Sequence, residues 1–149
     1  MLLRICAFES NLPASGLFNF FPVLCIMQDL AVIQQQLTSA ALFEAFRLQL
    51  AKDFDRSGLP TEFTQHLTPA FHGLVAQIAK ELRQCDKQSG THLSRLLYNV
   101  DISEAQLKRY LQESDEPDHW LVMAQLMVKR LLQKVVIRQY YKNNAGPTE

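Results

Sequence analysis

The C-terminal segment from about Asp118 to Tyr141 is the feature that most constrains the fold of this chain. Its spacing predicts one helix, a rod of about 24 residues and roughly 35 Å at 1.5 Å per residue. Apolar side chains occupy most of its circumference, namely Trp120, Leu121, Val122, Ala124, Leu126, Met127, Val128, Leu131, Leu132, Val135, Val136, Ile137 and Tyr140. Such a helix lies at the centre of a bundle or is buried by a partner. We therefore expect the rest of the fold to pack around it.

Apolar stripes with helical spacing also run through 28–55, 69–85 and 93–111. A short helical turn is expected over 61–67, and a surface loop over 86–90. Capping and turn residues divide these stretches, namely Thr38 and Ser39, the run 57–60, and the pair Thr68 and Pro69. No stretch alternates as a strand would. The sequence predicts an all-α fold, a compact bundle of four to six helices with a long, mostly apolar C-terminal helix.

Residues 1–26 differ from the rest of the chain. They contain two prolines, one glycine and only two charged residues, and they lack a sustained helical period. Their apolar run, 17–26, is too short to span a bilayer and contains a proline. Three interpretations stay open: Met27 is the true start, the segment packs on the fold, or it is a membrane or export signal. We expect one helical domain over 27–143 and a disordered tail over 144–149.

The charge is balanced overall but unevenly distributed. With 15 basic and 15 acidic residues, the whole chain lacks the net positive charge typical of polyanion-binding proteins. From His119 to Lys142, however, there are 5 basic residues and no acidic residue. Four of them recur every fourth residue and form what we call the basic stripe, Arg130, Lys134, Arg138 and Lys142. The stripe either binds phosphates or an acidic protein surface, or it is a solvated face near the negative end of the helix dipole.

The segment Leu93–Leu111 predicts a helix, a tight connection and a second helix. Ser103 and Gln106 have capping-box spacing at the start of the second helix. The segment resembles the DNA-binding helix-turn-helix, which implies that four residues are available to face a groove, namely Glu104, Gln106, Lys108 and Arg109. Asp101 stands where the motif usually has Gly, and Asp tolerates a left-handed backbone better than most residues. The alternative is two consecutive bundle helices joined by a capped turn.

The sequence contains no pattern typical of a catalytic or metal site. Its three cysteines form no C-x-x-C pair, which favours a reducing, cytoplasmic compartment. It has no Gly-rich phosphate loop, no G-x-S-x-G and no H-E-x-x-H. A metal- or thiol-dependent enzyme would require several scattered residues to converge in one pocket, namely His66, His92, His119 or Cys85. We therefore predict no enzyme activity, no catalytic residues, no cofactor and no metal.

Two functions follow from these patterns. The first is a helical protein-interaction or scaffold module, with self-association as a homo-oligomer if the last helix exceeds what a small monomer can bury. The second is a nucleic-acid-binding protein that uses 93–111 and the basic stripe. Candidate contacts for nucleic acid or an acidic partner are Lys108, Arg109, Arg130, Lys134, Arg138 and Lys142. No membrane partner is expected.

Charge geometry separates these two functions. Nucleic-acid binding gains support if Lys108 and Arg109 lie on the same surface as the basic stripe. It loses support if acidic residues share that surface instead, namely Asp101, Glu104 and Glu113.

Overall fold

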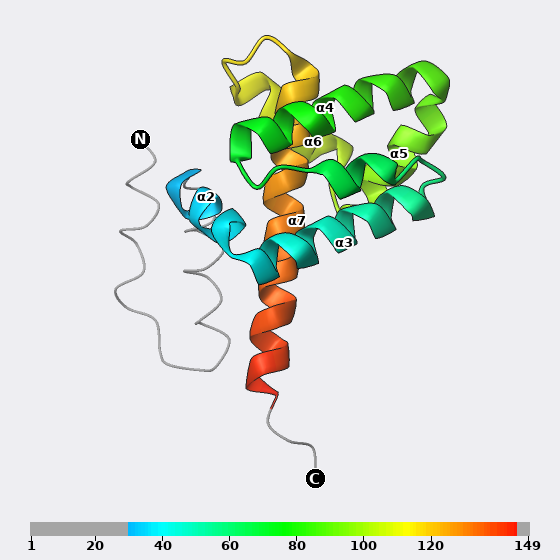
Figure 1. The fold of residues 1–149 in the computed structure, drawn as a ribbon. Helices are drawn as coiled ribbons and strands as arrows, with labels where there is room; N and C mark the ends of the chain where they lie inside the picture. The colour runs from blue at the N-terminus through cyan, green and yellow to red at the C-terminus, as the bar shows by residue number, and fades with distance from the viewer. Residues whose placement is uncertain (1–29, 146–149) are drawn as a thin grey trace.

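A computed structural model of this chain describes residues 30–145 (Figure 1). These residues form six α-helices and one 3-10 helix, and no strand occurs among them. In chain order the elements are α2 (Leu30–Thr38), α3 (Ala40–Arg56), η3 (Glu62–His66), α4 (Phe71–Gln88), α5 (Gly90–Asn99), α6 (Glu104–Glu113) and α7 (His119–Asn144). The predicted all-α fold is confirmed. The predicted extension over 1–26 and most of the predicted tail over 144–149 lie outside the described residues.

Helix α7 is the axis of the molecule. Helices α3 and α4 cross it, α6 packs along it, and α2 and α5 complete the bundle through α3 and α4 (Figure 1). Its buried residues lie on all sides of the helix, namely Val122, Met123, Ala124, Leu126, Met127, Val128, Leu131, Leu132 and Val135. The end of α7 extends past α3, where Tyr140 and Tyr141 are exposed. The apolar circumference of α7 is thus buried largely by helices of its own chain.

Several predicted boundaries are confirmed. Ser39 separates α2 from α3, and its hydroxyl accepts a hydrogen bond from the Leu42 N–H at 3.4 Å. Helix α3 ends in a Schellman motif, in which Gly58 has φ +74°. In that motif the Gly58 N–H donates to the Asp55 carbonyl, and the Leu59 N–H donates to the Phe54 carbonyl at 3.0 Å. The short turn predicted over 61–67 is the 3-10 helix η3.

The start of α4 differs from the prediction. Thr68 and Pro69 were expected to open the helix, but it begins at Phe71. Gln34 of α2 takes over the capping role, because its side-chain oxygen accepts from the Phe71 N–H at 2.9 Å. Its amide nitrogen donates to the Pro69 carbonyl at 3.4 Å. The cap comes from 37 residues away, so no local pattern around Thr68 reveals it.

The loop expected over 86–90 is also shorter than predicted. Helix α4 continues to Gln88, and Ser89 alone separates it from α5. The Ser89 N–H still donates to the Cys85 carbonyl at 3.0 Å, which keeps the chain helical almost to the break. The polar residues read as a loop are instead the solvent-facing last turn of α4.

Asp118 joins the start of α7 to α4. One carboxylate oxygen accepts from the Trp120 N–H at 3.0 Å, and the other lies 2.5 Å from the Arg83 guanidinium. Partial desolvation raises the pKa of Asp118, but the Trp120 N–H and Arg83 outweigh it, so the pKa falls below its ordinary value. The carboxylate is thus more readily ionised in the folded chain than in the unfolded one.

The first prediction concerns the buried axis. We expect Leu131→Ala to lower the free energy of unfolding by about 2–5 kcal/mol, because it leaves a cavity at a fully buried position. Leu48→Ala, on an exposed part of α3, is the matched control and should change it by less than about 0.5 kcal/mol. Urea denaturation measures both. Equal losses would contradict the central role of α7.

The second prediction concerns pH. Because the folded pKa of Asp118 is lowered, its contribution to stability is present above the unfolded value of 3.8 and is lost as pH falls through the folded value. Asp118→Asn keeps a capping oxygen but removes the charge. We therefore expect a lower Tm than wild type at neutral pH, and a difference that disappears below the folded pKa. Asp115→Asn, in the same connection, is the control and should shift Tm little. A pH-independent difference would show that the charge is irrelevant.

Candidate interaction groove along helix α7

The connection between α5 and α6 has the predicted turn chemistry. Asp101 adopts φ +62°, and two hydrogen bonds close a Schellman motif around it. The Asp101 N–H donates to the Tyr98 carbonyl at 3.1 Å, and the Ile102 N–H donates to the Leu97 carbonyl at 2.9 Å. Ser103 caps α6 by accepting from the Gln106 N–H at 3.1 Å. These hydrogen bonds fix the direction in which the chain leaves α5, and α6 then packs on α7.

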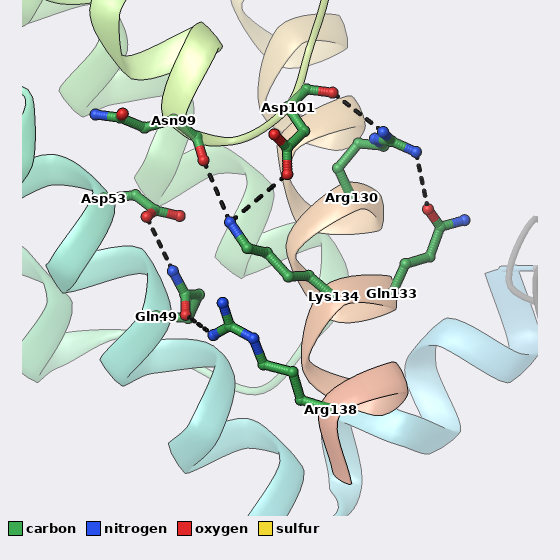
Figure 2. Close-up of polar contacts among 8 residues, drawn as sticks. All are labelled: Gln49, Asp53, Asn99, Asp101, Arg130, Gln133, Lys134 and Arg138. Atoms are coloured by element: carbon green, nitrogen blue, oxygen red, sulfur yellow. Dashed lines mark hydrogen bonds and ion pairs between the residues drawn. The ribbon is translucent and has the colours of Figure 1, made fainter. Parts of the chain in front are cut away.

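Three residues of the basic stripe make hydrogen bonds to other helices of the bundle or to the turn that follows α5. Figure 2 shows Arg130 and Lys134 reaching the C-terminal end of α5. Arg130 donates to the Asp101 carbonyl at 3.1 Å, and Lys134 donates to the Asn99 carbonyl at 3.3 Å. Lys134 also lies 3.7 Å from the Asp101 carboxylate. Carbonyls at a helix C-terminus carry the negative end of the dipole, so these two cations stabilise the end of α5.

Arg138, the next member of the stripe, contacts α3. Its guanidinium donates to the side-chain oxygen of Gln49, whose amide nitrogen donates to the Asp53 carboxylate at 2.9 Å (Figure 2). Asp53 is fully buried, and its second carboxylate oxygen has no hydrogen-bond partner among the described residues. One buried amide thus links a cation on α7 to a carboxylate in the core. Lys142, the last member of the stripe, is exposed on the protruding end of α7.

Two hollows follow α7 on this side. The first, of about 450 Å³, lies between α6 and α7 and is lined by Gln106, Arg109, Tyr110, Glu113, Ser114, Gln125, Leu126, Lys129, Arg130 and Gln133. The second, of about 300 Å³, is lined by Val100, Asp101, Arg130, Gln133, Lys134, Ile137 and Arg138. Because the hollows share Arg130 and Gln133, we treat them as one feature, the α7 groove.

The α7 groove carries more positive than negative charge. Five cations line it, Arg109, Lys129, Arg130, Lys134 and Arg138, against two acidic residues, Asp101 and Glu113. Of the ion pairs among residues 30–145, only the pair between Lys134 and Asp101 joins two residues of the groove. The ammonium of Lys129 donates to the Tyr110 hydroxyl and lies 5.1 Å from the centroid of its ring. Uncompensated cations in a hollow favour an anionic ligand.

The candidate contact residues do not all gather on this groove. Arg109 lines it together with Arg130, Lys134 and Arg138, whereas Lys108 and Lys142 do not line it. Of the three acidic residues expected to oppose nucleic acid, Asp101 and Glu113 line the groove and Glu104 does not. Lys129 was not among the candidates, because its role depends on the contact with Tyr110 across two helices.

Helices α5 and α6 pack on different neighbours. Helix α5 packs chiefly on α4 and α3, and α6 packs chiefly on α7. In a helix-turn-helix the two helices form one compact unit, with the second presented to the DNA. The arrangement around 93–111 therefore corresponds more closely to two consecutive bundle helices joined by a capped turn.

The histidines and Cys85 are spread over the bundle. His66, His72 and His119 are exposed on three different elements, and His92 lies half-buried near Gly58. Cys85 is buried, and burial raises the pKa of its thiol, so the nucleophilic thiolate is disfavoured. No cluster of three or more His, Cys, Asp or Glu residues suited to a metal occurs in the part of the chain that the structure describes.

Comparison with known proteins adds no further constraint. No family model, curated protein or solved structure matches this chain. Across 30–145, no helix combines the length and hydropathy needed to cross a membrane. Interpretation of the function therefore depends on the chemistry of the α7 groove.

The third prediction separates structural cations from free ones. Lys134→Met removes a charge that contacts both the end of α5 and Asp101, so we expect a loss of about 0.5–1 kcal/mol in the free energy of unfolding. Lys142→Met removes an exposed charge on the same stripe and should change it by less than about 0.5 kcal/mol. Chemical denaturation at low and high salt measures both. If the Lys134 variant is as stable as the Lys142 variant, the proposed cap on α5 is wrong.

Proposed function

We propose that this protein is a helical protein-interaction module that binds an acidic segment of a partner protein in the α7 groove. The observation that carries this proposal is the excess of cations in the groove, because four of the five make no ion pair within residues 30–145, namely Arg109, Lys129, Arg130 and Arg138. Carboxylates on a partner would supply the missing counter-charges. Such charge complementarity gives specificity and a faster association rate.

A protein partner fits this surface better than a nucleic acid. A protein that binds DNA neutralises several regularly spaced phosphates, and Asp101 and Glu113 interrupt the row of cations that such spacing needs. A protein segment can instead place single carboxylates at the cations and neutral residues opposite these two acids. Nucleic-acid binding remains the second candidate, because Arg109 and Arg130 do line the same hollow.

Self-association has less support than binding of a different protein. The hypothesis of a homo-oligomer depended on apolar surface that a monomer could not bury, and α3, α4 and α6 pack against α7. Within residues 30–145, the large apolar side chains that stay exposed are scattered over four helices, namely Leu30, Leu48, Tyr98, Tyr140 and Tyr141.

We place the protein in the cytoplasm, which agrees with the free thiol of Cys85.

The fourth prediction tests the partner chemistry. We expect a short Glu-rich peptide, acetylated and amidated at its ends and labelled with a fluorophore, to bind the full chain at low salt. Binding should weaken as salt approaches about 0.15 M. Arg109→Glu should weaken binding by about three- to tenfold, since that guanidinium lines the groove. Fluorescence anisotropy measures the affinity.

Lys108→Glu is the matched control, because it makes the same charge change on the same helix outside the groove. Equal effects of the two variants would show that net charge, rather than the groove, determines binding. A random-sequence DNA duplex provides the competing arm. Tighter binding of the duplex than of the peptide, with a steep loss of affinity as salt rises, would reject the proposal in favour of nucleic-acid binding.

A further inference from the structure

Lys129 and Tyr110 differ from the other polar pairs of the groove. The remaining cations on this side of α7 have acceptors within the chain, since Arg130 and Lys134 contact the end of α5 and Arg138 contacts Gln49. Lys129 donates to a neutral hydroxyl instead. Glu113 lines the same hollow yet forms no ion pair with it. The half-buried ammonium of Lys129 therefore meets no anionic acceptor among residues 30–145, and a bound partner can supply one.

We propose that Lys129 and the Tyr110 hydroxyl together form the position in the groove that binds one carboxylate, the side chain of an Asp or Glu residue in the acidic segment. This inference rests on the proposed function and names the atoms that would carry it. A docked carboxylate would bring two acceptor oxygens to two adjacent donor groups, one on α7 and one on α6.

The hydrogen-bond inventory supports a carboxylate. An ammonium has three N–H donors, and the contact with Tyr110 uses one of them. A tyrosine hydroxyl that accepts a hydrogen bond still has its own hydrogen to donate, and the structure gives that hydrogen no acceptor within residues 30–145. Two kinds of donor therefore meet at one place, and no anionic acceptor is bound to either. A carboxylate has only acceptor atoms and can accept hydrogen bonds from both donors.

The surroundings strengthen this interaction. Lys129 and Tyr110 are both half-buried, and charges attract one another more strongly there than in open water. Arg109 and Arg130 add positive charge to the same hollow, and Leu126 adds an apolar side chain to its lining. The hollow of about 450 Å³ lies within the usual range for ligand sites of about 300–1,000 Å³. It can therefore admit a side chain together with part of its backbone.

The test compares the Glu-rich peptide with a peptide of the same length in which every Glu is Gln. Both have blocked ends, so side chains carry all of the charge. We expect the Gln peptide to bind at least about tenfold more weakly. Tyr110→Phe removes one oxygen and keeps the ring, and we expect it to weaken binding of the Glu peptide by about three- to tenfold. Lys129→Met should weaken it by more than about tenfold.

Two control variants and a stability measurement accompany these. Lys108→Met removes a lysine charge on α6 outside the groove and should leave the affinity within about twofold. Lys129→Arg keeps the charge but moves the donors, so we expect an affinity between those of wild type and Lys129→Met. Urea denaturation of each variant identifies any loss of folding, and Tyr110→Phe, the smallest change, is the decisive variant if Lys129→Met unfolds.

Each outcome decides one of the two proposals. If the Glu peptide binds wild type, Tyr110→Phe and Lys129→Met equally well, this inference is wrong and the proposed function stands. If wild type does not bind the peptide, the proposed function fails and the inference fails with it. In a third arm, acetate and inorganic phosphate compete with the peptide at equal concentration and ionic strength. Displacement by phosphate alone would reject a carboxylate position and indicate a phosphate site.

Discussion

The fold depends on the need to remove most of the apolar surface of one long helix from water. Burial of apolar surface is the dominant favourable contribution to folding, and most of that surface in α7 lies between Val122 and Val135. One helix face cannot meet this need, so α3, α4 and α6 approach from different directions (Figure 1). Several polar residues of α7, among them Lys129, Arg130 and Lys134, consequently lie beside neighbouring helices, where the groove lies.

The groove is thus a consequence of packing as much as of charge. Arg130 and Lys134 occupy a side of α7 that faces the end of α5, and there they satisfy carbonyl groups that a helix terminus leaves without partners. Arg130 and Lys134 therefore stabilise the fold itself. Lys129, one residue away from Arg130, faces α6 and meets only a hydroxyl. Neighbouring residues of one basic segment therefore have different roles because they face different helices.

Local sequence predicted the elements well wherever the deciding interaction was local. The break at Ser39, the Schellman motif at Gly58 and the left-handed Asp101 all depend on residues within one turn. The start of α4 escaped prediction because its cap, Gln34, comes from another helix. The stripe was predicted as one surface, and Arg130, Lys134 and Arg138 do line one hollow. Their hydrogen bonds to α3 and to the end of α5 could not be predicted, because those partners are distant in the sequence.

In the candidate site too, features that depend on local residues were predicted and features that depend on distant residues were not. Arg109 was a candidate from the resemblance to a helix-turn-helix, and three members of the stripe were candidates from their charge and spacing. All four line the groove. Lys129 was not a candidate, because its contact with Tyr110 joins two helices and is visible only in three dimensions. The contact between α6 and α7 is set by the Asp101 turn, so the site depends on a backbone conformation far from Lys129 in the sequence.

Gln34 has a consequence for the order in which this chain folds. It bonds both the Phe71 N–H and the Pro69 carbonyl, so the first N–H of α4 gains this partner only after α2 has docked. Bringing together residues 37 positions apart costs chain entropy, and the stabilising contacts form only afterwards. The beginning of α4 should therefore exchange its amide hydrogens faster than its middle. Protection of the Phe71 amide would report the docking of α2 rather than the formation of α4 itself.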